Sequence, residues 1–208
     1  MSTAALPYAV VPYGERAVLL QVGGIDAVLG IYAALRHDPP PGVDDIIPAA
    51  ETVLVSFVDH RALADALPAL RALQPRPAER SIDDLARIPV TYDGDDLGDV
   101  AALTGLSVDG VIAIHSGTEY TVAFHGFSPG FAYLIGLDDR LRVPRRESPR
   151  TSVPAGSVAM TGGFTAVYPR RSPGGWRLLG RTDVAMWDDA RDEPALLHPG
   201  MRVRFEPQ

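Results

Sequence analysis

Three runs of residues decide the fold of this chain: HGFSPGFAYLIGL at 125–137, VPRRESPRTSVPAGSV at 143–158 and VYPRRSPGGWRLLGRT at 167–182. Gly and Pro recur every few residues in all three runs, among aromatic residues and Arg. Helices and central strands do not tolerate this density, because Pro removes an amide donor and Gly weakens regular structure. The runs therefore predict short strands joined by tight turns. Such turns often present a binding surface, although an irregular all-β domain also needs them for structural reasons alone.

The residues around these runs predict a mainly-β domain over 85–208. Apolar and alternating segments indicate strands at 86–92, 108–116, 119–124 and 201–205, with one short helix near 97–104. Many short strands separated by Gly and Pro turns are typical of a closed or nearly closed β-barrel.

The first part of the chain, residues 1–84, predicts an α+β domain with two layers and the order ββαββα. We expect strands at 7–13, 16–22, 43–49 and 52–58, with helices at 25–36 and 61–73. The segment 74–80 is polar and contains two Pro residues, which is typical of a linker.

Composition excludes several classes of function. The 208 residues include no Cys, which excludes disulfides, thiolate metal sites and Cys nucleophiles. The formal net charge of −7 argues against a nucleic-acid partner. The sequence contains neither an apolar run long enough to span a membrane nor a secretory signal pattern, so we expect a cytoplasmic protein. All 19 basic residues are Arg. The absence of Lys excludes a Walker A loop, a Schiff base and a Lys general base.

The residues Gly126-Phe-Ser-Pro-Gly130 match the G-x-S-x-G pattern of a nucleophile elbow. In that elbow the residue after the nucleophile donates its backbone N–H to the oxyanion, and here that residue is Pro129, which has no N–H. We therefore do not expect Ser128 to be a nucleophile. We expect it instead to cap a helix that begins at Pro129.

Arginine is concentrated in the second half of the chain. Five Arg residues fall within residues 140–150, and Arg170, Arg171 and Arg177 follow. Guanidinium groups suit carboxylates and phosphates, so these residues predict an anion-binding site. The alternative is that most are solvated and partly neutralised by Asp138, Asp139 and Glu147. We expect this alternative to hold for Arg142 and Arg146.

Several blocks of the chain resemble the KipI / PxpB family, whose members are known as PxpB-type subunits of 5-oxoprolinase and also as allophanate hydrolase subunit 1. The blocks are GFSPGF at 126–131, PR at 144–145, SPR at 148–150, VPAGSV at 153–158 and SPGGW at 172–176. The resemblance extends over nearly the whole chain and implies that the barrel at 85–208 is cyclophilin-like. Three residues depart from the family pattern and leave the substrate open: His125, Ile135 and Phe164.

The resemblance implies a subunit of an ATP-dependent 5-oxoprolinase, which converts 5-oxo-L-proline to L-glutamate. A KipA/PxpC-like partner would complete the site, a PxpA-like chain would complete the enzyme, and the assembled complex would bind ATP. We expect the isolated chain to be inactive, because it shows no self-contained nucleophile, base or phosphate loop. Two alternatives remain: a KipI-like inhibitor of a sensor histidine kinase, or a subunit of another amide-processing complex, allophanate- or urea carboxylase-like. The allophanate role is the least supported, since amidase-signature enzymes use a Lys.

Candidate site residues come from the residue chemistry and from the family blocks together. The catalytic candidates are His115, which we expect at the end of an apolar strand, Arg150, Ser157 and Tyr168. The substrate-binding candidates are Phe127, Phe131, Arg145, Gly156, Gly162, Gly163, Gly174, Gly175 and Trp176. Arg145 and Arg150 would contact an anion or organise the site loop. The glycine pairs would form anion nests or simple hairpin turns, and the rings of Tyr168 and Trp176 would line a site or pack the barrel. No His residue has metal-ligand spacing, so no metal is expected.

Overall fold

The structure is a computed structural model that describes residues 8–77 and 85–208. The chain divides into two compact units, residues 1–80 and 81–208, and each is described by itself. The boundary expected at residue 84 and the end of the linker expected at 74–80 lie outside the described residues.

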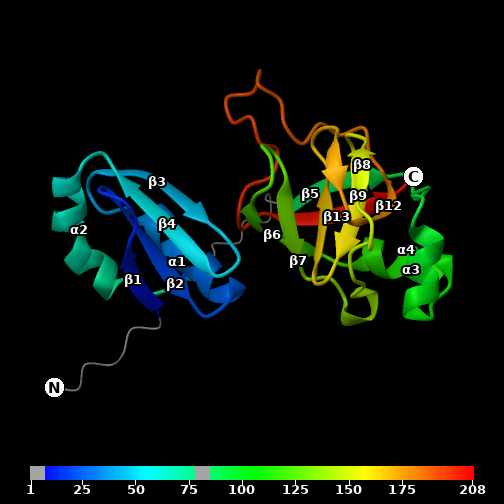
Figure 1. Cartoon of the computed structure of the whole chain (residues 1–208), viewed down its shortest axis with the longest axis horizontal. Helices are drawn as coiled ribbons and strands as arrows, with labels where there is room; N and C mark the ends of the chain where they lie inside the picture. Colours follow the sequence, from blue (N-terminus) through cyan, green and yellow to red (C-terminus); the bar gives the residue numbers. More distant parts are fainter. Residues whose placement is uncertain (1–7, 78–84) are drawn as a thin grey trace. The chain divides into compact units, whose positions relative to one another are not determined.

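The N-terminal unit has the element order predicted for it. Its elements are β1 (Tyr8–Pro12), β2 (Ala17–Val22), α1 (Ile25–His37), β3 (Val43–Pro48), β4 (Thr52–Phe57) and α2 (His60–Ala72). The strands form one antiparallel sheet in the order β1-β2-β4-β3, and both helices pack against it (Figure 1). The order ββαββα is therefore confirmed, apart from residue 7, which is not described.

Alternation within the strands builds the core of this unit. On β4, Val53, Val55 and Phe57 are completely buried while the residues between them are partly exposed, as expected for a sheet that covers its core on one face. Asp59 starts α2, because its carboxylate accepts a 2.8 Å hydrogen bond from the backbone N–H of Ala62.

The C-terminal unit contains the predicted barrel sheet. Seven strands follow the order β12-β9-β10-β7-β6-β13-β5. Their bounds are β5 (Leu85–Val90), β6 (Tyr120–His125), β7 (Ala132–Ile135), β9 (Ser157–Thr161), β10 (Phe164–Val167), β12 (Arg177–Arg181) and β13 (Arg202–Pro207). Thr91 and Arg181 exchange two backbone hydrogen bonds of 2.9 Å, which tie the two outer strands together and leave the barrel nearly closed. A separate ribbon pairs β8 (Arg150–Val153) with β11 (Ser172–Gly174).

The strand predicted at 108–116 is wrong. These residues form α4 (Val108–Gly117), which follows α3 (Leu97–Thr104). Ser107 caps α4 by accepting a 3.0 Å hydrogen bond from the N–H of Gly110, and Val111 and His115, four residues apart, face the core. A short apolar run does not distinguish a buried helix from a strand by periodicity, so Ser107 was the informative signal.

No single helix within the described residues is long and apolar enough to cross a membrane. Taken together, α3 and α4 would be long and apolar enough by length and composition, with a bend of 94° between them.

Candidate functional site

The turn between β6 and β7 contains the G-x-S-x-G residues, and it is not a helix. The N–H of Ser128 donates to the carbonyl of Gly126 at 2.7 Å, and the N–H of Phe131 donates to the carbonyl of Ser128 at 3.0 Å. The expectation that Ser128 caps a helix is therefore wrong, because Pro129 and Gly130 form a tight turn that leads directly into β7. The hydroxyl oxygen of Ser128 is shielded from solvent and has no hydrogen-bond partner among the described residues.

In the enzyme complex that the sequence predicts, Ser128→Ala should leave the turnover number within about threefold of the wild-type value. The shielded hydroxyl makes no hydrogen bond to a base among the described residues, as an activated nucleophile requires. Steady-state kinetics of the assembled enzyme would check this expectation. A loss of several orders of magnitude would show that Ser128 takes part in the chemistry.

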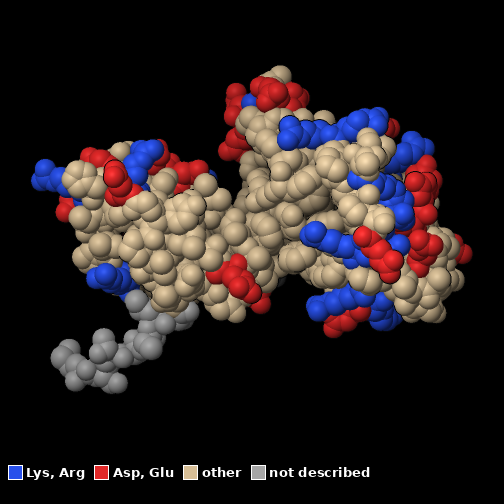
Figure 2. Space-filling view, viewed as in Figure 1, with Lys and Arg blue, Asp and Glu red and all other residues tan. Residues whose placement is uncertain are grey.

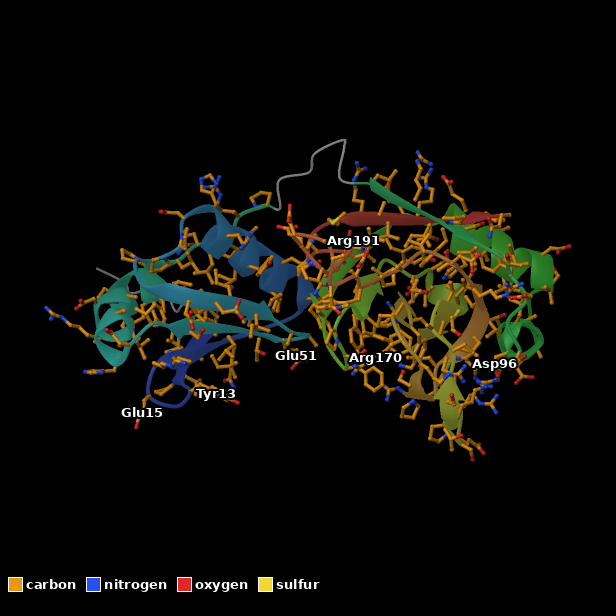
Figure 3. The ribbon with its side chains drawn as sticks, turned by 90° about the horizontal axis from the view of Figure 1, so that it is seen from above. Tyr13, Glu15, Glu51, Asp96, Arg170 and Arg191 are labelled. Carbon is orange, nitrogen blue, oxygen red and sulfur yellow. The ribbon has the colours of Figure 1, made fainter. Side chains whose placement is uncertain are left out.

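A buried carboxylate organises the Arg-rich loops. Asp96 precedes α3 with 1% of its surface exposed, and it lies beside that helix in Figure 3. Both terminal nitrogens of Arg150 bind its carboxylate, at 2.8 and 3.0 Å. Arg146 forms a further short ion pair with it, and the N–H of Leu178 on β12 donates to it at 2.8 Å. Arg146 is therefore not simply solvated, contrary to our expectation, and Arg150 organises the loop.

The electrostatics of this cluster favour the ionised carboxylate. Burial alone would raise the pKa of Asp96, but the hydrogen bonds from Arg150, from the Leu178 amide and from Arg146 hold it below its usual value. The same interaction raises the pKa of Arg150. The carboxylate of Asp96 therefore remains charged at neutral pH, and the cluster holds α3, β12 and the loop at 144–150 together.

Most of the remaining arginines of this unit are also neutralised. Figure 2 shows blue Arg side chains beside red carboxylates on this unit. The acidic segment 93–99 supplies three more carboxylates, which pair Asp93 with Arg181, Asp95 with Arg150 and Asp99 with Arg177. As expected, Asp138 and Asp139 pair with Arg140 and Arg142. Arg145, Arg170 and Arg171 are exposed and make no ion pair with a described residue. Arg171 donates to the hydroxyl of Ser152 at 3.0 Å, so Arg145 and Arg170 are the side chains best placed to bind an anion.

Three of the candidate aromatic residues form a buried cluster. Phe131, Tyr168 and Trp176 expose 2%, 1% and 5% of their surface, and the ring of Phe131 lies 5.2 Å from that of Tyr168 and 5.3 Å from that of Trp176. Burial raises the pKa of Tyr168. A Cβ atom at Gly174 would overlap the Tyr168 hydroxyl, so this glycine lets the ribbon pack over the ring. The arrangement supports barrel packing for these rings.

The glycine turns use their amides internally. A Cβ at Gly156 would overlap the carbonyl oxygen of Thr182, and the N–H of Gly156 donates to the carbonyl of Tyr168 at 2.8 Å. Gly162 begins the two-residue turn between β9 and β10 and donates to the carbonyl of Val143 at 2.8 Å. The close approach at Gly156 therefore serves the fold, and the amides of these two glycines are not free for a ligand.

His115 lies in the barrel core, away from any strand end. Its ring is completely buried on α4 and stacks on Phe205, with the ring centroids 4.8 Å apart. Its two nitrogens bind the hydroxyls of Tyr92 and Thr165, at 2.8 and 2.9 Å. Burial lowers the pKa of His115 to about 3. A satisfied, neutral and inaccessible imidazole is a structural group, and we do not retain it as a catalyst. Ser157 at the start of β9 is likewise buried, with 5% of its surface exposed.

The candidate site is therefore the surface around the β8–β11 ribbon and the β6–β7 turn. It offers the exposed guanidinium of Arg145, the connection between β11 and β12 at Gly175, and an exposed Phe127, whereas Gly163 lies apart from it, on the β9–β10 turn beside Arg142. Within the described residues, no group of His, Asp and Glu side chains could hold a metal ion. Sequence reasoning missed Asp96, although four acids at 93–99 facing an Arg-rich second half were a usable signal.

Known proteins resemble this chain over most of its length. Residues 8–197 match the family model described as carboxyltransferase domain, subdomain C and D. A 5-oxoprolinase subunit of Escherichia coli O157:H7 is 46% identical over 179 residues, which are 81% of this chain and 79% of that protein. The corresponding 5-oxoprolinase subunit of Bacillus subtilis strain 168 is 39% identical over 202 residues, which are 89% of this chain and 83% of that protein.

A solved structure has a similar fold. The crystal structure of TTHA0988 superposes with a TM-score of 0.81 and 40% sequence identity over 93% of this chain. The match spans only 40% of the TTHA0988 chain, so a region similar to this chain is there one part of a longer polypeptide.

Proposed function

The chain belongs to the KipI / PxpB family of 5-oxoprolinase subunits, and from this premise we propose that it is the non-autonomous, cytoplasmic PxpB-type subunit of an ATP-dependent 5-oxoprolinase. In the proposed reaction the complex opens the lactam of 5-oxo-L-proline to give L-glutamate, coupled to ATP hydrolysis. A KipA/PxpC-like subunit completes the site, and a PxpA-like subunit completes the enzyme.

The likeness to proteins named as 5-oxoprolinase subunits, over about four fifths of both chains, carries this proposal. The loop geometry is consistent with it. Opening an unstrained lactam requires activation of its carbonyl, and coupling to ATP would create a phosphorylated intermediate that guanidinium groups can stabilise. Arg145 is exposed and without an ion pair among the described residues, whereas Arg150 is occupied by Asp96.

Two of the glycine amides expected to bind a phosphate are already engaged in the fold. The amides of Gly156 and Gly162 already donate to the carbonyls of Tyr168 and Val143, so they cannot cradle a phosphate without breaking the fold. We therefore assign most of the ATP contacts to a partner subunit, with Arg145 as the contribution of this chain.

We expect the isolated chain to release neither ADP nor glutamate from 5-oxoproline and ATP, and the assembled subunits to release both. Coupled ADP and glutamate assays on the chain alone, and on the chain purified with the other subunits from the same organism, would measure this. Arg145→Ala should raise the KM of the assembly for ATP, because the bound phosphate loses its counter-charge. Turnover by the chain alone, or an inactive assembly with all subunits bound, would contradict the proposal.

A further inference from the structure

Phe127 is held in a backbone conformation that a phenylalanine rarely adopts. Its φ is 67°, in the left-handed region, and the hydrogen bond from Ser128 N–H to the Gly126 carbonyl closes a three-residue turn around it. This form of γ-turn is rare and strained for any residue with a Cβ. A glycine at position 127 would form the same turn without the penalty.

Two further local penalties lie beside Phe127. The hydroxyl oxygen of Ser128 and the Nε2 atom of His125 are shielded from solvent without a hydrogen-bond partner among the described residues. Buried polar atoms are nearly always paired, so each exception calls for a reason. Penalties concentrated in four residues indicate that the turn is maintained for what it presents rather than for the stability of the chain.

The side chain that this turn presents is exposed and rests against a buried aromatic ring. Phe127 has 60% of its surface accessible, the largest exposed fraction among the large apolar side chains described in this unit. Its ring meets the buried ring of Phe131 edge-on at 5.4 Å, and Gly126 N–H donates to the Phe131 carbonyl at 3.1 Å. This contact restricts the ring, so it loses less conformational entropy on binding than a fully solvated side chain would.

The position of Phe127 favours a protein partner over a small substrate. A substrate wall belongs in a concave pocket that buries most of the ligand, whereas Phe127 stands on the tip of the β6–β7 turn. Exposed, preorganised aromatic side chains are typical anchors of protein interfaces. The neighbouring surface carries charges of both signs, because Gly130 of the same turn approaches Pro169, which precedes Arg170, and Trp187, which begins the acidic segment 187–193.

We propose that Phe127 is the anchor of the subunit interface and inserts into an apolar pocket on the KipA/PxpC-like subunit of the enzyme. The inference rests on the proposed function, since it requires the subunits that the names of the relatives imply. It replaces the expectation that Phe127 contacts the substrate. TTHA0988, in which a region like this chain is part of a longer polypeptide, supports a stable neighbour for this fold.

The test is the variant Phe127→Gly in the full-length chain. Binding to the remaining 5-oxoprolinase subunits of the same organism would be measured by interferometry, and the melting temperature of the isolated chain by calorimetry. We expect affinity to fall about thirty-fold or more, as for a central aromatic anchor. The melting temperature should stay within about 3 °C, because the lost ring contact is offset by relief of backbone strain.

Leu103→Ala is the matched control, because Leu103 is a similarly exposed apolar side chain on α3, with 53% of its surface accessible. The affinity of the Leu103→Ala chain for the other subunits should match that of the wild-type chain.

Three results would overturn the proposal. The first is a wild-type assembly that is active while Phe127→Gly binds the other subunits within threefold of the wild-type affinity. The second is unchanged affinity with a raised KM for 5-oxoproline, which would make Phe127 a substrate wall. The third is a large fall in melting temperature, which would make the ring a structural support. An inactive wild-type assembly with every subunit bound would instead count against the proposed function.

Discussion

Asp96→Ala should lower the free energy of unfolding of the C-terminal unit by about 3 kcal/mol, because it leaves two partly buried cations without their counter-charge. Asp96 is 1% exposed, while the side chains of Arg146 and Arg150 expose 31% and 18% of their surface. The N–H of Leu178 also loses its acceptor. The loop at 144–150 would be released from α3 and β12, so Arg145 would no longer be held in place.

Denaturant unfolding followed by tryptophan fluorescence would measure this loss. Both Trp residues of the chain, Trp176 and Trp187, belong to the C-terminal unit, so their signal reports on that unit alone. Asp95→Ala is the control. Asp95 is exposed and 3.7 Å from Arg150, and its loss should change the free energy of unfolding by less than about 0.5 kcal/mol.

A double-mutant cycle of Asp96→Ala with Arg150→Met would isolate the interaction free energy between these two side chains. We expect a coupling free energy above about 1.5 kcal/mol, since each charge is costly to bury alone. A coupling below about 0.5 kcal/mol would show that the cluster does not hold the loop.

The pKa of Asp96 is lowered in the folded chain, so its contribution to stability depends on pH. That contribution is present above the unfolded-state pKa, about 3.9, and is lost as the pH falls through the folded-state value.

Local patterns predicted the N-terminal unit well, because each of its elements is encoded over a few residues. The apolar alternation at 52–57 and the Pro-rich stop after α1 both act within one element. The barrel sheet was also predictable, from the frequency of Gly and Pro turns. The segment at 108–116, misassigned as a strand, had no such clear period, and only its cap distinguished helix from strand.

The site was harder to predict because it depends on residues that are distant in sequence. Asp96 meets Arg146 and Arg150 across 50 and 54 residues, and that separation is closed only by the barrel topology. The burial of Tyr168 and Trp176 likewise follows from the way the ribbon packs over the barrel. The strained backbone of Phe127 has no sequence signature, since glycine is the residue expected at positive φ.

Acidification should destabilise the barrel through His115 alone by about 2 kcal/mol between pH 7 and pH 5. Thr165 donates its hydroxyl proton to the carbonyl of Ala159 at 3.0 Å, so it must accept from Nε2–H of His115. Nδ1 then accepts from the hydroxyl of Tyr92. Both nitrogens are satisfied in the neutral tautomer, so protonation would place an unpaired charge in an apolar core.

The direction of this pH dependence follows from the folded-state and unfolded-state pKa values of His115. Burial lowers the folded-state pKa of His115 to about 3, while the unfolded chain titrates near 6.5. Between these values the unfolded state binds more protons, so stability is full above about pH 6.5 and falls as the pH decreases towards 3. His125 contributes in the same direction, because burial lowers its pKa as well.

Comparison with His115→Gln separates the two histidines. The variant should be less stable at pH 7, because an amide does not reproduce the stacking on Phe205, but its free energy of unfolding should change by about 2 kcal/mol less between pH 7 and pH 5. His125→Gln, measured in the same way, reports the contribution of the partly buried His125 ring to the pH dependence of the free energy of unfolding. Equal pH slopes for wild type and His115→Gln would mean that His115 is protonated in the folded chain, and that its network with Tyr92 and Thr165 opens readily to water.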